Sequence, residues 1–354
     1  MRVLILGGTG AIGLATVNVL CERGVDVTVT SRRAFQPKTG VKVRVGDAHK
    51  IPFIDSLLSE SWDVIIDFMT YAVSEFEMRV EPLLDATDQY VFLSSGRVYA
   101  DENGAITEKS IRFLDSISRA DGIPSGDYAL TKAIQEDLLA DTGRSNWTII
   151  RPYITYNYNR LQLGTLEKED WLFRALSGRP IVFPKELLDC ETTLTYAGDV
   201  GYVIASLLGQ SGALGTAFNA TGAEECNITW QEVIDIYSDV LNAFCERRVE
   251  VIYQSMEKFL EYRSLDTQIQ MSYDRLYNRR FDTANISKFL SVDSFMTPSV
   301  GLEKCVSQFL KNREFKGVNW GREALIDKSV GSRAAWSDIH GFKDKLRYFL
   351  RRGF

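Results

Sequence analysis

Tyr128 and Lys132 are four residues apart, and their types and spacing suggest acid–base chemistry. On a helix, this spacing places the phenol and the ammonium group on one face. A tyrosine acts as an acid or base near neutral pH when its pKa falls from about 10 toward 7, a change of roughly 4 kcal/mol. A neighbouring lysine charge favours that fall. The alternative is a solvated pair, because the same spacing often occurs on helices by chance.

Two serines, Ser94 and Ser95, directly follow the apolar stretch 90–93, which is predicted to be a buried strand. Open parallel sheets bind ligands at the carboxyl ends of their strands. We therefore expect Ser95 to donate a hydrogen bond to a substrate oxygen while Tyr128 moves the proton. The alternative is that both hydroxyls only cap backbone groups in a turn.

Residues 7–13 read Gly-Gly-Thr-Gly-Ala-Ile-Gly and lie between a predicted strand and a predicted helix. Gly7 permits a tight turn, Gly10 lets the backbone approach a pyrophosphate, and Gly13 lets the helix press on the sheet. The free N–H groups of the helix start would bind the phosphates. This context predicts a dinucleotide site. Its expected contacts are Gly7, Thr9, Gly10, Ala11, Ile12 and Gly13, with Ser94, Tyr128 and Lys132 further along the cofactor.

The second predicted strand ends in Ser31, Arg32 and Arg33 instead of an acidic residue. An acidic side chain there would bind the adenosine 2′-hydroxyl, whereas Ser and Arg suit a 2′-phosphate. NADP is therefore favoured over NAD, unless the arginines are merely solvated. Asp47 follows the third strand, where its carboxylate would accept from the adenine amino group or, alternatively, cap a helix.

Short β-branched runs alternate with helical patterns through residues 1–152. The expected strands are Val3–Leu6, Val25–Thr30, Val41–Val45, Asp63–Asp67, Tyr90–Leu93 and Trp147–Arg151, and the expected helices are Ala11–Arg23, Ile54–Ser59, Glu75–Ala86 and Tyr128–Ala140. This rhythm indicates βαβ units, hence an α/β protein with a doubly wound parallel sheet of the Rossmann type.

After Pro152 the alternation stops, and a smaller, discontinuous second domain is expected. We predict that 1–155 and 192–222 form the nucleotide-binding domain, 156–191 and 223–311 a substrate-binding domain, and 312–354 a C-terminal extension on the surface. Residues 342–352 carry apolar side chains at helical spacing and a net charge of +4. This helix would contact a membrane surface or a partner, or else be a solvated last helix with one face on the core.

Composition excludes several classes of protein. The 45% of hydrophobic and 25% of charged residues are ordinary for a soluble globular protein, and the net charge of −6 argues against nucleic acid as a partner. The five cysteines lack a C-x-x-C pair, and only His49 and His340 are present, so neither a metal site nor a disulfide framework is expected. No apolar run reaches the roughly 18 residues of a membrane span. We expect a cytoplasmic protein.

Together, these motifs resemble the extended short-chain dehydrogenase/reductase family, the NAD-dependent epimerase/dehydratase proteins that act on nucleotide sugars. The resemblance covers roughly residues 1–300. It rests on the glycine loop, the Tyr128/Lys132 pair, and Ser94-Ser95-Gly96-Arg97-Val98-Tyr99, Arg151-Pro152, Asp199-Val200, Phe218-Asn219, Gly222 and Thr229-Trp230.

The resemblance implies roles for individual residues. Tyr128 would be the acid/base, Lys132 would lower its pKa and hold the nicotinamide ribose, and Ser95 would polarise the substrate oxygen while hydride moves between nicotinamide and a sugar carbon, without a metal. The expected partner is a small-molecule nucleotide sugar, with a homodimer as one oligomeric option. Substrate contacts are expected from Arg97, Tyr153, Arg275 and Arg280; a solvated basic turn at Arg275, Arg279 and Arg280 is the alternative.

The chain departs from the family pattern at several positions. Gly96 and Arg97 stand where dehydratases have an acidic pair, which disfavours dehydration. Ile154 replaces the usual Asn, and Thr192 replaces an Arg, both of which normally contact the nucleotide sugar. Ser31 and Arg32 favour exchangeable NADPH over tightly held NAD.

The leading functional hypothesis is therefore an NADP-dependent reductase of a keto-sugar nucleotide, such as a 4-keto-6-deoxy sugar of bacterial surface polysaccharide synthesis. An NAD-dependent 4-epimerase is the first alternative. A non-catalytic, NADP-binding or RNA-associated member of the family is the second; such a member would be expected to lose the Tyr or the Lys, and this chain keeps both.

Overall fold

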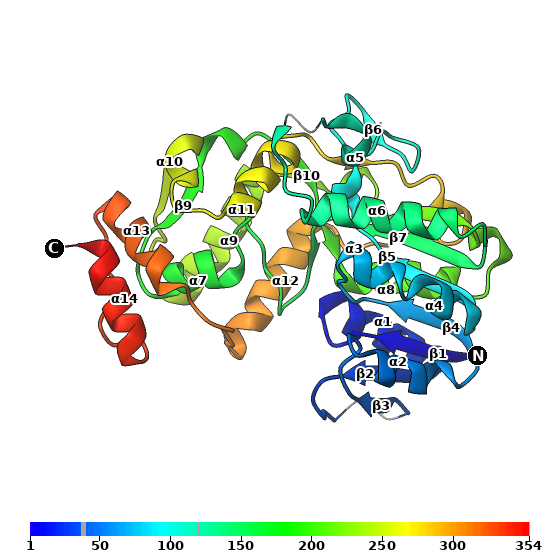
Figure 1. The fold of residues 1–354 in the computed structure, drawn as a ribbon. Coiled ribbons are helices and arrows are strands. Elements are labelled where there is room, and N and C mark those ends of the chain that lie inside the picture. Colours follow the sequence, from blue (N-terminus) through cyan, green and yellow to red (C-terminus); the bar gives the residue numbers. More distant parts are fainter. Residues whose placement is uncertain (37–39, 119–120, 354) are drawn as a thin grey trace. The chain divides into compact units, whose positions relative to one another are not determined.

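The computed structural model describes residues 1–36, 40–118 and 121–353 (Figure 1). The chain forms two compact units, each built from separate segments. Unit 1 comprises Met1–Thr155, Thr193–Cys226 and Arg279–Thr297; unit 2 comprises Tyr156–Thr192, Asn227–Asn278 and Pro298–Phe354, of which Phe354 lies outside the described residues.

Unit 1 is built around a seven-stranded sheet in the order β12-β7-β5-β4-β1-β2-β3, in which every neighbouring pair is parallel. The strands are β1 (Arg2–Leu6), β2 (Asp26–Ser31), β3 (Lys42–Val45), β4 (Trp62–Asp67), β5 (Thr87–Leu93), β7 (Trp147–Pro152) and β12 (Thr216–Ala220). The strand order reverses at β1, so helices cover both faces of the sheet. The predicted α/β, doubly wound fold is confirmed.

Helices of unit 1 cover both faces of this sheet. They are α1 (Ala11–Glu22), α2 (Ile51–Leu58), α3 (Val73–Glu77), α4 (Val80–Asp85), α5 (Phe113–Ser116), α6 (Tyr128–Asp141) and α8 (Ala197–Leu207). Val3 and Ile5 of β1 point to a core with α1 and α8, and Leu4 and Leu6 point to a core with α2, α3, α4 and α6. Alternation along each buried strand thus fills two cores from one sequence run.

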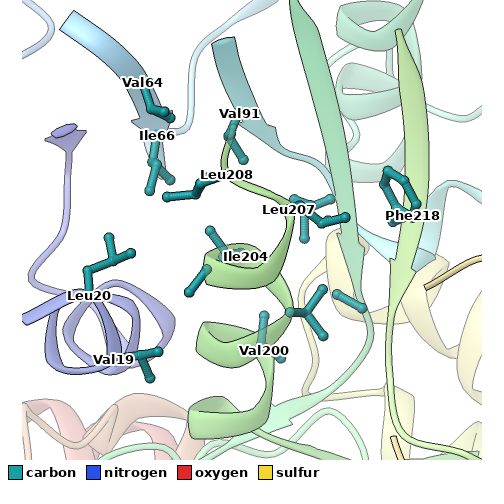
Figure 2. Close-up of a cluster of buried hydrophobic side chains, with 14 of the residues drawn as sticks. Val19, Leu20, Val64, Ile66, Val91, Val200, Ile204, Leu207, Leu208 and Phe218 are labelled. Carbon is teal, nitrogen blue, oxygen red and sulfur yellow. The ribbon is translucent and has the colours of Figure 1, made fainter. Parts of the chain in front are cut away.

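Figure 2 shows the first of these cores. Val19 and Leu20 of α1 lie beside Val200, Ile204 and Leu207 of α8, and all five side chains are almost fully buried. The two helices form one apolar layer against the sheet. This layer holds the start of α1 in place at the carboxyl edge of β1.

The helix predicted at 75–86 is two helices in the structure. α3 ends at Glu77 and α4 begins at Val80. Pro82 has no N–H to donate to the Met78 carbonyl four residues earlier, so a continuous helix would lose that bond and meet the proline ring. The buried Arg79 at the break donates to the carbonyls of Ala48 and His49.

Unit 2 is mainly helical. It contains α7 (Lys168–Leu176), α9 (Trp230–Cys245), α10 (Met256–Leu260), α11 (Leu265–Gln270), α12 (Pro298–Lys311), α13 (Trp320–Val330), α14 (Phe342–Arg352), β9 (Ile181–Pro184) and β14 (Val251–Gln254). β9 and β14 pair in parallel. Short strands near the points where the chain passes between the units are β8 (Thr155–Tyr156), β10 (Glu191–Thr193), β11 (Thr195–Tyr196) and β13 (Asn227–Thr229).

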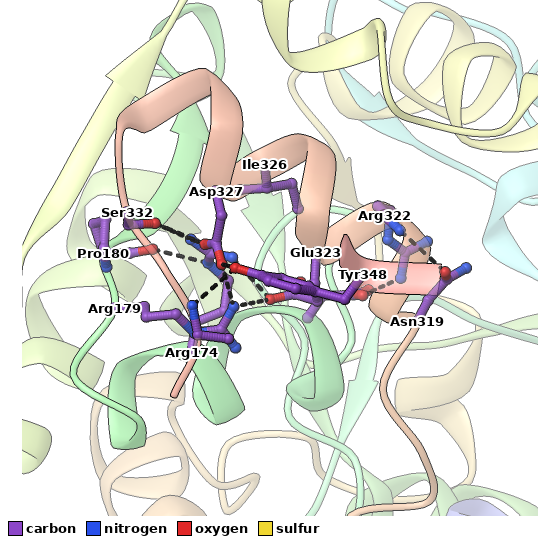
Figure 3. A network of polar contacts seen from close by, with 12 residues as sticks. Arg174, Arg179, Pro180, Asn319, Arg322, Glu323, Ile326, Asp327, Ser332 and Tyr348 are labelled. Atoms are coloured by element: carbon purple, nitrogen blue, oxygen red, sulfur yellow. Dashed lines mark hydrogen bonds and ion pairs between the residues drawn. The ribbon is translucent and has the colours of Figure 1, made fainter. Parts of the chain in front are cut away.

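Residues 312–354 were predicted to be a surface extension, but they are part of unit 2. Glu323 and Asp327 of α13 are fully buried and form ion pairs with Arg174 and Arg179 (Figure 3). Tyr348 of α14 donates to Asp327 over 2.5 Å. Because charged residues occupy buried positions of α13, its sequence shows weak apolar periodicity. The pattern therefore suggested a segment on the surface.

A second boundary also differs from the prediction, which assigned residues 279–297 to the substrate domain. They belong to unit 1. There, β15 (Arg280–Phe281) pairs with β6 (Ala105–Ile106), and Ile286, Val292 and Phe295 join the core of Figure 2. The chain returns to unit 1 here because these apolar side chains are buried in its core. Their spacing along the sequence does not show which of the two units they join.

Candidate active site

The glycine loop between β1 and α1 is a tight turn. Gly7 has a φ of +70°, a conformation that glycine adopts without strain, and its N–H donates to the Thr30 hydroxyl over 3.0 Å. A Cβ at Gly13 would lie 2.7 Å from the backbone of Gly8, whereas a Cβ at Gly10 would meet nothing within 4 Å. Gly13 is therefore needed for packing, and Gly10 leaves open space beside the helix start.

The first turn of α1 is suited to an anion. Gly10 is its N-cap residue and no side chain caps the helix. The N–H groups at Ala11 and Ile12 therefore lie at the positive end of the helix dipole. This is the arrangement in which Rossmann proteins hold a pyrophosphate.

A cavity of about 270 Å³ lies beside this loop, at the carboxyl edge of the sheet. Its lining contains the predicted residues Gly7, Thr9, Ser31, Arg32 and Asp47. The lining also includes residues that the sequence analysis did not select: Thr30, Gly46, Ala48, His49, Phe68, Met69 and Thr70. Each of these lies at or just after the carboxyl end of β2, β3 or β4, so strand ends were the signal that could have found them.

The cavity lining includes two of the three residues predicted at the end of β2. Ser31 and Arg32 line the cavity, whereas the Arg33 carbonyl accepts a hydrogen bond from the Ser31 hydroxyl over 2.7 Å. Arg32 is therefore the guanidinium that is placed to meet a group bound in the cavity.

Asp47 does not cap a helix, so that alternative was wrong. The N-cap residue of α2 is Lys50, and the Asp47 carboxylate accepts the N–H of His49 over 3.1 Å. The carboxylate closes a local turn because three residues separate it from the helix start. It remains part of the cavity lining.

Ser95 and Ser94 follow the end of β5. The Ser95 hydroxyl accepts the N–H of Arg97 over 3.2 Å and so caps the short turn η1 (Gly96–Val98). Its own proton is still available to donate to another oxygen. The Ser94 hydroxyl is buried and has no hydrogen-bond partner within the described ranges of the chain. A buried unpaired hydroxyl at a strand end is consistent with a ligand group beside it.

Tyr128 and Lys132 lie in the first turns of α6. Asp127 caps this helix by accepting from the N–H groups of Ala129 and Leu130. Tyr128 is 38% exposed, whereas Lys132 is only 3% exposed and donates to the Leu93 carbonyl over 2.7 Å. This hydrogen bond joins α6 to the end of β5, directly before Ser94.

Burial controls the protonation of Lys132. It lowers the pKa of this ammonium group to about 8, although the carboxylates of Asp67 and Glu136 act in the opposite direction. Asp67 was not selected from the sequence. It lies at the end of β4, is fully buried, and accepts from the Tyr90 hydroxyl over 2.9 Å. Its burial raises the pKa of the Asp67 carboxyl.

Arg97 and Tyr153 also lie in unit 1. The Arg97 guanidinium is 3.9 Å from the Asp127 carboxylate and lies over the Tyr128 ring. Tyr153 is buried, and its ring centre is 5.0 Å from that of Phe281. Ile154, which follows it, has a φ of +30°, a costly conformation for a β-branched residue.

The three arginines of the predicted basic turn do not share one environment. Arg275, in unit 2, is buried, forms an ion pair with Asp274 and donates to the Gly164 carbonyl over 3.3 Å. Arg279 is buried and donates to the carbonyls of Tyr99 and Ala100. Of these residues, Arg280 on β15 is exposed. A solvated turn is therefore wrong for Arg275 and Arg279.

Within residues 1–36, 40–118 and 121–353, no group of three or more His, Cys, Asp or Glu side chains could hold a metal ion. Over the same residues, no helix is both long and apolar enough to cross a membrane.

Comparison with known proteins identifies the family. Residues 3–219 match the model of the NAD dependent epimerase/dehydratase family. The chloroplast stem-loop binding protein of 41 kDa b from Arabidopsis thaliana is 30% identical over 244 residues, which span 62% of this chain and 58% of that protein.

Solved structures with the same fold include two nucleotide-sugar enzymes. The UDP-glucose 4-epimerase of Thermus thermophilus in complex with NAD is 20% identical with a TM-score of 0.63, over 88% of this chain and 100% of the other. The UDP-glucuronic acid 4-epimerase of Bacillus cereus in complex with NAD is 16% identical with a TM-score of 0.63, over 88% and 98%. By its glycine loop, its sheet and the match over residues 3–219, the chain belongs to the NAD dependent epimerase/dehydratase family.

Proposed function

We propose that the protein is an NAD-dependent epimerase that inverts a hydroxyl-bearing carbon, C4, of a nucleotide sugar. The observation that carries this proposal is the hydrogen bond from Lys132 to Leu93, because it joins the helix that carries Tyr128 and Lys132 to the strand end that precedes Ser94 and Ser95. The glycine loop and its cavity lie at the same carboxyl edge of the sheet. The solved epimerases with this fold that are named above contain NAD.

The residues present fit such a cofactor. The open space at Gly10, the uncapped start of α1 and the unpaired Ser94 hydroxyl would hold its phosphates and nicotinamide end. NAD, when bound, supplies reversible hydride acceptance at a sugar carbon. The Tyr128 oxygen would take the proton of the sugar hydroxyl and later return it, while Ser95 would donate to the same oxygen. Lys132, close to Tyr128, would favour the ionised phenol.

Epimerisation is preferred to keto-sugar reduction because of the bound cofactor of the epimerases with this fold. One observation favours the reductase: Arg32 lines the cavity where a 2′-phosphate would lie. The two reactions differ in their cofactor balance. An epimerase returns the hydride and leaves NAD unchanged, whereas a reductase consumes NADPH in each turnover.

A second candidate function is RNA association, which is favoured by the name of the Arabidopsis relative. The net charge of −6 and the presence of both Tyr128 and Lys132 argue for catalysis instead. A gel-shift assay with a stem-loop RNA is expected to show no complex at physiological salt.

The decisive experiment has two parts. The purified protein is denatured and the released cofactor is identified by mass; NAD or NADH at near-equimolar amount is expected. The protein is then incubated with UDP-glucose and UDP-glucuronic acid, and products are resolved by chromatography. The Tyr128→Phe variant serves as control, with turnover lower by orders of magnitude and unchanged cofactor content. Release of NADP together with NADPH oxidation by keto-sugar nucleotides would replace the epimerase with the reductase.

A further inference from the structure

The last helix, α14, exposes a stripe of apolar side chains. Phe342 is 80% exposed, Leu350 68%, Leu346 46% and Phe349 41%. At about 100° per residue, these positions fall within an arc of about 100° on the helix. An unbroken apolar stripe of this kind on a short helix usually marks an interaction surface.

The opposite side of α14 is fixed to α13. Tyr348 is buried and donates to the Asp327 carboxylate (Figure 3). Its hydroxyl also accepts the Ala334 N–H over 2.9 Å. Trp320 packs edge-on against its ring at 5.9 Å. The exposed stripe therefore belongs to an anchored helix and is not the spare face of a frayed end.

Cations flank the apolar stripe on both sides. Helical spacing places Lys343 and Arg347 along one border and Lys345 along the other. Lys345 also lies 5.2 Å from the ring centre of the half-exposed Trp336. Residues 342–352 carry five basic side chains and one acidic one, although the protein as a whole is acidic.

We propose that α14 docks on a membrane surface that contains anionic lipids. Phe342, Leu346 and Leu350 would enter the boundary between headgroups and acyl chains, and the flanking lysines would meet the lipid phosphates. An apolar arc bordered by cations is complementary to such a surface in both polarity and charge. The helix would lie in the plane of the membrane because its other side is held on α13.

Two other occupants fit the observations less well. A nucleic acid would bind the cations but leave the apolar stripe in water. A second copy of this chain would need acidic groups facing the lysines as well as an apolar surface. Neither partner uses both features of the helix as a lipid surface does.

The proposal is tested by flotation of the full chain with vesicles. One set contains one part phosphatidylglycerol to two parts phosphatidylcholine, and the other contains phosphatidylcholine alone. Wild type is expected to float with the anionic set only, and added salt is expected to weaken binding. The double substitution Phe342→Ser with Leu350→Ser is expected to weaken binding about tenfold or more, since the two most exposed apolar side chains of the stripe no longer enter the lipid.

A matched control substitutes exposed apolar residues elsewhere, Ile111→Ser with Met78→Ser, and is expected to bind as wild type. A second variant, Lys343→Glu with Lys345→Glu, retains the apolar stripe and tests whether the flanking positive charges are needed for binding. Melting temperatures of all variants establish that they fold. Absence of wild-type binding, equal loss in the control, or a stripe-dependent dimer or RNA complex without vesicle binding would overturn the proposal. None of these results depends on the proposed catalytic function.

Discussion

The guanidinium carbon of Arg97 lies 5.3 Å from the centre of the Tyr128 ring. Arg97 follows Ser95 in the turn after β5, and Tyr128 begins α6, so this contact joins the two elements that carry the candidate catalytic residues. In the family pattern described above, dehydratases have an acidic residue at this position. A cation here favours a negatively charged phenol oxygen and provides no carboxylate for the elimination of water.

Substitution Arg97→Gln is expected to lower kcat about tenfold and to move the acidic limb of its pH profile upward, because a cation no longer favours the ionised phenol. Arg97→Lys retains the charge and should restore most of the profile. The measurement is kcat against pH at saturating substrate. An unchanged profile in the Gln variant would show that Arg97 does not act on Tyr128.

Substitution Lys132→Met is expected to stabilise the fold and abolish activity. Burial lowers the pKa of Lys132 to about 8, so between about pH 8 and 10.5 the folded chain binds fewer protons than the unfolded chain, and stability rises with pH across that range. After loss of the hydrogen bond to Leu93, we expect a gain of roughly 1–2 kcal/mol at pH 7.

Urea unfolding of this variant at pH 7 and near pH 10 checks the sign, since the gain should shrink at the higher pH. The exposed Lys109→Met is the control and should change little at either pH. A destabilised Lys132→Met protein at pH 7 would mean that the Leu93 and carboxylate interactions outweigh the cost of burial.

The glycines of the loop should separate folding from cofactor binding. Gly13→Ala is expected to destabilise the protein by roughly 2 kcal/mol or more, because its Cβ would lie 2.7 Å from the Gly8 backbone. Gly10→Ala should fold normally but bind NAD at least about tenfold more weakly, since its methyl group fills the space at the helix start. Thermal melting and calorimetric titration with NAD distinguish the two effects.

Arg32→Ala is expected to weaken binding of NADPH about tenfold while changing NADH binding little. Arg32 lines the cavity, and only a 2′-phosphate would gain from its guanidinium. The neighbouring Arg33→Ala is the matched control, since Arg33 is not part of the lining described above. Fluorescence titration with both nucleotides measures the ratio; equal losses for both would remove Arg32 from cofactor discrimination.

Glu323→Gln is expected to destabilise unit 2 by about 3 kcal/mol, because it leaves the buried guanidinium groups of Arg174 and Arg179 with one carboxylate fewer. The exposed Glu314→Gln should change stability by less than about 0.5 kcal/mol. Denaturant unfolding followed by circular dichroism measures both. If Glu323→Gln left the stability unchanged, the remaining ion pairs would have rearranged to compensate for the lost carboxylate.

Local patterns predicted the strands and the first turn of unit 1 well. The six strands expected through Arg151 all occur within a few residues of their predicted ends. Most of them are buried, and buried parallel strands are short apolar or β-branched runs bounded by turn residues; β3, at the edge of the sheet, is mostly exposed. The glycine loop was equally visible, since its spacing reflects backbone constraints that are local to one turn. The break at Pro82 is also local, and could have been predicted from the missing N–H group.

Other features depended on contacts between distant segments. Thr30 lies at the end of β2, and Asp67 and Met69 lie at or just after the end of β4; these two strands flank β1 and come together only when the sheet forms. Glu323 and Asp327 are buried because arginines from α7 and the loop after it meet them there, which no helical periodicity reveals.

The amino-acid sequence by itself therefore determined six strands of the sheet, the turn after the first of them and the residue types available for proton transfer, since each depends on neighbours in the chain. Only the tertiary structure decided which charges are buried, that Asp47 closes a turn, and that α14 is anchored by Tyr348 with an apolar stripe exposed. Those outcomes depend on contacts between segments that are distant in the sequence, because the free energy of a buried charge depends on the partners that surround it in the folded protein.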